Sequence, residues 1–143
     1  MAEILHDFPV NVLPTRIFEA FTTPLGLDAW WTLRSSGEPK LGCEYQLDFG
    51  PGFEWRARVT RCVPGREFEL EFTRAMEDWV GSRVGVTLEA TTTGTQVRFH
   101  HRGWPETGEH FRVSSYCWAM YLRVMKRNLE LGETVPYEDR LNV

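Results

Sequence analysis

Residues 55–72 read WRARVTRCVPGREFELEF, and this stretch decides the fold. Apolar and charged side chains alternate on both sides of the segment VPGR at 63–66, which is typical of two half-buried strands. Proline and glycine stand at its second and third positions, where a type II turn requires them. A two-residue loop there predicts these pairs across the hairpin: Val59 with Leu70 on the buried face, and Arg58 with Glu71 on the exposed face.

Outside the hairpin, similar alternation predicts further strands near residues 4–12, 45–49, 84–88 and 97–101. Two short helices are expected after the first strand, because Pro14 and Pro24 suit the first position of a helix and Thr23 suits an N-cap. A long amphipathic helix is expected over about residues 113–131, ended by Gly132. The sequence therefore predicts an α+β fold in one domain over residues 1–143. A curved antiparallel sheet of about six strands would wrap around the last helix.

Composition excludes several classes of protein. The 143 residues carry a net charge of −4, so no basic face for nucleic acid is expected. The N-terminus MAEILHDFPV lacks the apolar run of a signal peptide, and the longest apolar run, at 117–122, is too short to span a membrane. Three scattered cysteines suggest neither a disulfide framework nor a zinc site. We expect a cytoplasmic protein without metal or cofactor.

Histidines are the main candidates for chemistry, because no common nucleotide-binding or hydrolase motif occurs. His100 and His101 are adjacent on a strand, so their side chains face opposite sides of the sheet. An inward His101 could act as acid, base or ligand anchor, or could be a core histidine bonded to a backbone carbonyl. His110 is expected to be exposed on a polar loop. Glutamates at 67, 69 and 71 are expected on a solvated strand face.

Aromatic side chains dominate the positions that should face inward. They allow two interpretations, a plain aromatic core or the wall of an apolar pocket between the sheet and the last helix. The inward set comprises Trp30, Trp31, Tyr45, Phe49, Trp55, Phe68, Phe72, Phe99 and Trp118.

The order of elements is similar to the helix-grip fold of START-like (SRPBCC) proteins. Within that superfamily, the sequence resembles the domain homologous to the C-terminal part of the activator of Hsp90 ATPase. Cys117 stands where that family usually has glycine before a tryptophan. The matching features cover nearly the whole chain: FEAFTTPLGLDAWW at 18–31, Gly42, YQLDFG at 45–50, the hairpin at 55–72, Trp79, GTQVRFHHRGW at 94–104, and Cys117, Trp118 and Leu122.

The resemblance and the inward aromatic residues together lead to a first hypothesis of small-molecule binding. The partner would be an apolar or amphipathic molecule held between the sheet and the last helix, with His101 as its polar anchor. The expected cavity-lining residues are Trp30, Trp31, Trp55, Phe72, Phe99, His101 and Trp118.

Two other functions are kept open. The resemblance implies a chaperone-linked interaction protein with an Hsp90-type partner, although the eukaryotic activators carry a further N-terminal domain for much of that contact. The third hypothesis is a cyclase- or hydrolase-like enzyme that uses His101 with an inward carboxylate. Acidic residues in the patterned strands all fall on the outward face, which counts against an enzyme. No catalytic residue is therefore assigned.

Overall fold

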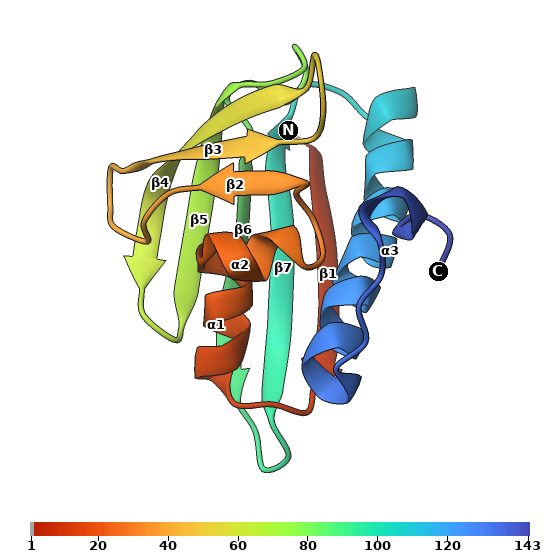
Figure 1. Cartoon of the computed structure of the whole chain (residues 1–143). Coiled ribbons are helices and arrows are strands. Elements are labelled where there is room, and N and C mark those ends of the chain that lie inside the picture. The colour runs from red at the N-terminus through yellow and green to blue at the C-terminus, as the bar shows by residue number, and fades with distance from the viewer. Residues whose placement is uncertain (1) are drawn as a thin grey trace.

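A curved antiparallel sheet with helices on one face forms the molecule, as the computed structural model of residues 2–143 shows (Figure 1). The strands lie in the order β1-β7-β6-β5-β4-β3-β2. This confirms the expected α+β helix-grip arrangement. The elements are β1 (Ala2–Val10), α1 (Pro14–Thr22), α2 (Pro24–Asp28), β2 (Arg34–Ser36), β3 (Glu44–Asp48), β4 (Glu54–Val63), β5 (Glu67–Arg74), β6 (Arg83–Ala90), β7 (Thr95–Trp104), α3 (Glu109–Leu131) and the 3₁₀ turn η1 (Tyr137–Asp139).

One strand more than expected is present within the described residues. All three residues of β2 pair with β3. A strand of three residues is too short for an alternating pattern to appear in the sequence. The three helices share one face of the sheet, with α3 beside β1 and α1 close to β5 and β6 (Figure 1). No helix within residues 2–143 is both long and apolar enough to cross a membrane.

The hairpin that decides the fold has the expected pairs. Val59 faces Leu70 on the buried side and Arg58 faces Glu71 on the outer side. The loop, however, is one residue longer than expected, because Val63 pairs with Glu67. An irregularity in the β4 register around residue 60 absorbs the extra residue, so the buried face stays in phase.

Helix ends follow their local signals. The side chain of Thr23 accepts a hydrogen bond from the backbone N–H of Gly26, which caps α2, and Pro14 and Pro24 each begin a helix. Gly132 ends α3 in the left-handed conformation, with a φ of 69°. α3 begins at Glu109, earlier than expected, because its first turn is too polar to show a helical apolar stripe.

His100 and His101 face opposite sides of the sheet, as expected. On the outer side His100 Nε2 lies 2.8 Å from a carboxylate oxygen of Glu69. The expectation of a solvated Glu69 is wrong, because this side chain is buried. Gly85 of β6 lies between the two in the strand pairing, and a Cβ there would stand 2.7 Å from the His100 ring. The missing side chain lets His100 cover the carboxylate.

The same contact decides the charge of Glu69. Burial alone would raise the pKa of its carboxyl, but the hydrogen bonds from His100 and Thr60 and the charges of His100 and Arg83 lower it to about 2. Glu69 is therefore an ionised structural group on the outer face of the sheet.

Candidate functional site

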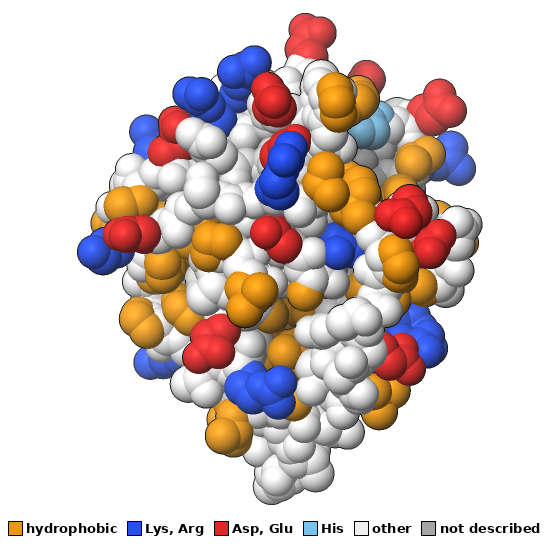
Figure 2. Space-filling view, viewed as in Figure 1, with side chains coloured by type: hydrophobic (Ala, Val, Ile, Leu, Met, Phe, Trp, Pro, Cys, Tyr) orange, Lys and Arg blue, Asp and Glu red, His pale blue; other side chains and the backbone are white. Residues whose placement is uncertain are grey.

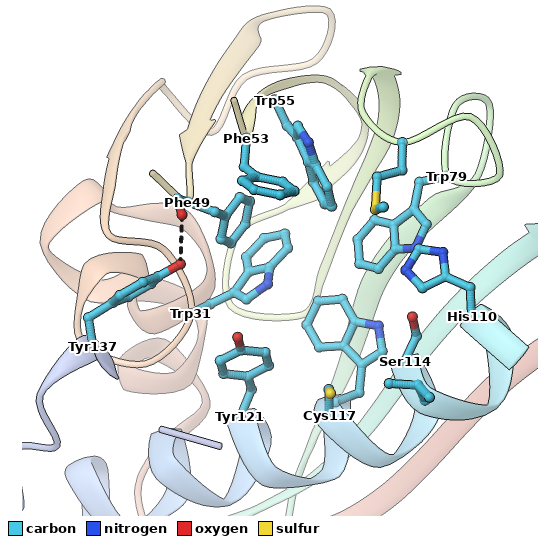
Figure 3. Close-up of a pocket in the computed structure, with 13 residues that line it drawn as sticks. Trp31, Phe49, Phe53, Trp55, Trp79, His110, Ser114, Cys117, Tyr121 and Tyr137 are labelled. Carbon is cyan, nitrogen blue, oxygen red and sulfur yellow. Dashed lines mark hydrogen bonds between the residues drawn. The ribbon is translucent and has the colours of Figure 1, made fainter. Parts of the chain in front are cut away.

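A pocket of about 300 Å³ opens between the first half of α3 and one end of the sheet. The β3–β4 hairpin and the β5–β6 loop form its other walls, and Figure 2 shows apolar side chains gathered between the first turns of α3 and the neighbouring strands. Aromatic side chains make up most of the lining (Figure 3). The lining residues are Trp31, Phe49, Phe53, Trp55, Met76, Trp79, His110, Val113, Ser114, Cys117, Trp118, Tyr121 and Tyr137.

Five of these aromatic rings form a closed circle of contacts. The centroid of Trp31 lies 5.4 Å from that of Phe49, which lies 5.0 Å from Trp55. The centroid of Trp79 lies 4.9 Å from that of Trp55 and 6.0 Å from that of Trp118. Trp118 closes the circle, 5.0 Å from Trp31. All lie within the range in which aromatic pairs attract, so the pocket wall is well packed.

Three of the residues expected to line a cavity, Trp31, Trp55 and Trp118, lie in this lining. That they bind a ligand stays a prediction. The other four lie behind the wall and do not line the pocket: Trp30, Phe72, Phe99 and His101.

These four residues are part of the core. The indole N–H of Trp30 donates to the carbonyl oxygen of Ala20 at 2.9 Å, within the helical layer. Phe72 packs edge-on against Trp31 and Trp55. Phe99 is 1% exposed and contacts Trp118 with centroids 4.7 Å apart. The inward positions in the sequence therefore include both the residues that line the pocket and the core residues behind them, and the pattern does not distinguish the two groups.

His101 is fully buried in a chain of hydrogen bonds behind the pocket. Its Nδ1 accepts the indole N–H of Trp118 at 3.1 Å. In the neutral ring the proton is therefore on Nε2, which donates to Ser82 Oγ at 2.8 Å. The Ser82 hydroxyl in turn donates to the carbonyl oxygen of Trp79 at 2.6 Å.

Burial is the main cause that lowers the pKa of His101 to about 3, with smaller contributions from the charges of His100 and His110. Both ring nitrogens are used inside the protein, and no carboxylate of residues 2–143 hydrogen-bonds to the ring. His101 is thus a neutral residue that positions Trp118 and the β5–β6 loop. Neither the polar-anchor role nor the acid–base role expected for it has support in this geometry.

The prediction that His110 is exposed on a loop is wrong. This residue lies in the first turn of α3, lines the pocket and is only partly exposed. Its Nδ1 is 2.6 Å from a carboxylate oxygen of Asp78 on the β5–β6 loop. The ring stacks on Trp79 with an interplanar angle of 25°. This pair joins α3 to the loop. The two residues are 32 positions apart in the sequence, so no local pattern predicts the contact.

Tyr137 reaches the pocket because the C-terminal segment is anchored beside it. The guanidinium of Arg140, 6% exposed, donates to the backbone carbonyl oxygens of Thr32 and Asp28 at 3.1 and 2.6 Å. Tyr137 then donates its hydroxyl to the carbonyl oxygen of Phe49 at 3.1 Å (Figure 3). This segment has no periodic pattern, so its place in the site cannot be predicted from the sequence.

Charge is nearly absent from the lining. Burial is the main cause that raises the pKa of Tyr121 to about 12 and that raises the pKa of the Cys117 thiol, so both are neutral near pH 7. No Lys or Arg lines the pocket within the described residues, and His110 pairs with the Asp78 carboxylate at its wall. Residues 2–143 also contain no group of three or more His, Cys, Asp or Glu side chains that could hold a metal ion.

Comparison with known proteins identifies the family of this chain. The model of the family described as "Activator of Hsp90 ATPase homolog 1-like protein" matches residues 11–130. The chain belongs to this family. No curated protein sequence matches it significantly.

Solved structures of similar fold include the following three. The Aha1 dimer from Colwellia psychrerythraea is 30% identical, with a TM-score of 0.84 over 93% of this chain and 99% of that chain. SSP2350 from Staphylococcus saprophyticus is 20% identical, with a TM-score of 0.79 over 94% of this chain and 96% of that one. MLL2253 from Mesorhizobium loti is 18% identical, with a TM-score of 0.82 over 92% and 99%. The last two show the fold alone.

Proposed function

We propose that this member of the family binds a small apolar or amphipathic molecule in the pocket between α3 and the sheet. The observation that carries the proposal is the closed circle of aromatic rings in the wall of a cavity of about 300 Å³. Concave, mostly apolar sites with a few convergent polar groups are typical of small-molecule binding.

Exposure at the pocket mouth supports the same conclusion. Phe53, Met76 and Val113 line the pocket and are 47%, 45% and 51% exposed. They come from three different elements, the β3–β4 turn, the β5–β6 loop and α3. Apolar side chains that converge from separate elements and remain in water are expected where an apolar ligand enters.

Binding is tested by screening the purified protein against lipids, flavonoids and polyketides with thermal shift and native mass spectrometry. A ligand that binds only the folded state raises the melting temperature. The blocking variant is Cys117→Trp, because Cys117 lines the pocket and a larger side chain there fills it. The matched control is Ala119→Trp on the exposed face of α3.

Hits that bind the wild type and Ala119→Trp but not Cys117→Trp support the proposal. Absence of any bound species and of any stabilisation across all classes contradicts it. Equal binding to Cys117→Trp would place the ligand elsewhere and would also contradict it.

A second candidate function is a contact with an Hsp90-type chaperone. It is favoured by the family match and by 30% identity to the Aha1 protein over nearly the full length of both chains. A pull-down with the Hsp90 homologue of the same cell, together with its ATPase rate, tests this function. Stimulation of the ATPase that persists in Cys117→Trp would favour the chaperone role. An unchanged rate would leave ligand binding as the function.

A further inference from the structure

In one corner of the pocket, a residue of the wall carries a buried hydrogen-bond donor without an acceptor. The indole Nε1 of Trp79 is buried and has no hydrogen-bond partner among residues 2–143. Trp79 itself is 6% exposed and lines the pocket. Because buried donors in native proteins are almost always paired, an unpaired one beside a cavity points to a ligand atom that accepts from it.

His110 adds an acceptor to the same corner. An ionised carboxylate can only accept, so Asp78 fixes the proton of the neutral imidazole on Nδ1. The other ring nitrogen, Nε2, then presents a lone pair. Ser114, one helical turn further along α3 and 5% exposed, supplies a hydroxyl that can donate or accept. Figure 3 shows Trp79, His110 and Ser114 around the same side of the pocket.

A donor and an acceptor in one corner select among ligand groups. A hydroxyl can accept from the Trp79 N–H and donate to His110 Nε2, whereas a carbonyl can only accept. A carboxylate is disfavoured, because no Lys or Arg of the described chain lines the pocket and the Asp78 carboxylate is adjacent. The aromatic circle favours a flat ring system as the body of the ligand.

We propose that Trp79, His110 and Ser114 bind the hydroxyl group of a hydroxylated aromatic ligand. The inference rests on the proposed function and names the chemistry of its ligand. Asp78 is a positioning residue, since it acts through the His110 ring.

Three probes of similar size test the hydroxyl: 2-naphthol, 2-methoxynaphthalene and decahydro-2-naphthol. Methylation removes the donor and keeps the ring, whereas saturation keeps the hydroxyl and removes the aromatic body. Affinity is measured by calorimetry, and the Trp79 indole N–H resonance is followed by ¹H–¹⁵N NMR. We expect 2-naphthol to bind about tenfold more tightly than its methyl ether, as a hydrogen bond of ordinary net strength implies. The Trp79 indole signal should move downfield with 2-naphthol.

Variants separate a local role from a general one. His110→Phe should reduce the ratio between 2-naphthol and its ether to about one while the ether still binds, and Ser114→Ala should lower it. The matched control is Ser115→Ala, the next residue on α3, which lies outside the pocket lining and should keep the wild-type ratio.

Equal affinities for 2-naphthol and the ether would overturn the inference and leave the proposed function standing. Tighter binding of decahydro-2-naphthol than of 2-naphthol would overturn the aromatic part. Failure of every probe to bind would overturn the inference, while the ligand screen with Cys117→Trp decides the proposed function independently.

Discussion

The two halves of α3 pack against the sheet in different ways. Its first half presents Ser114, Cys117 and Tyr121 to an open pocket. Its second half presents Val124 and Met125, 1% and 0% exposed, to a filled core. α1 contacts α3, β5 and β6, and Figure 1 shows it at the same end of the molecule as this second half.

The difference separates the part of the fold that contributes packing stability from the part that leaves room for a ligand. Val124 and Met125 of the second half belong to the filled core, whereas the first half faces large rings that line a cavity. Rigid rings that contact one another can hold a wall in place without filling the space before it. The comparison predicts that substitutions in the second half cost stability and that substitutions in the first half affect binding.

The largest effect is expected when one residue of each half is truncated. Met125→Ala leaves a cavity in the filled half and should lower the free energy of unfolding by about 2–5 kcal/mol. Its counterpart Cys117→Ala, two turns earlier, enlarges an existing pocket and should change that free energy by no more than about 0.5 kcal/mol. Urea unfolding of both variants checks this. Similar losses for the two would show that the first half is filled as well.

An intermediate effect is expected for the polar chain behind the pocket. Ser82→Ala removes the acceptor for His101 Nε2 and leaves a fully buried N–H unpaired, which should cost about 1–3 kcal/mol. Thr95→Val, which removes a buried hydroxyl bonded to the carbonyl oxygen of Val12, is a comparison in the other part of the sheet. Chemical denaturation measures both. A neutral result for Ser82→Ala would contradict the assigned network.

A further effect, which grows gradually with acidity, is expected in the response to mild acid. The pKa of His101 is lowered from 6.5 to about 3 in the folded state, so below pH 6.5 the unfolded chain binds a proton that the folded chain does not. Stability should therefore fall as the pH decreases from 6.5 towards 3.

Hydrogen exchange shows where this loss begins. The amides of the β5–β6 loop and the first half of α3 should lose protection before those around Met125. His101→Gln, which does not titrate, should flatten the dependence above pH 4.5, where the lowered pKa of Glu69 adds nothing. An unchanged slope in that variant would contradict the assignment to His101.

The fold could be predicted because its signals are local. Strand alternation around the VPGR turn fixed the faces of the hairpin, and the observed pairs of Val59 with Leu70 and Arg58 with Glu71 follow from it. Proline, threonine and glycine placed the helix ends. The buried Glu69 could not be predicted, since it depends on a histidine two strands away whose ring reaches it across Gly85 of the strand between them.

The site was only partly accessible to sequence analysis. The alternating pattern places Trp55 and Phe72 on the same face of the sheet. Whether each lines the pocket or lies behind the lining depends on how the helices pack against the sheet. Met76, Trp79 and Tyr137 lie in segments without regular periodicity, and His110 lies in a helical turn that has no apolar stripe. For Trp79, the available signal was its place among the features shared with the family, which gave no inward assignment.

The location of a bound ligand tests the central claim most directly. Intermolecular NOEs between a hit from the ligand screen and the ring protons of the isotope-labelled protein report that location. We predict contacts with Trp31, Trp55 and Tyr121 and none with Met125. Contacts to the Met125 half of α3, or to the outer face of the sheet, would contradict it.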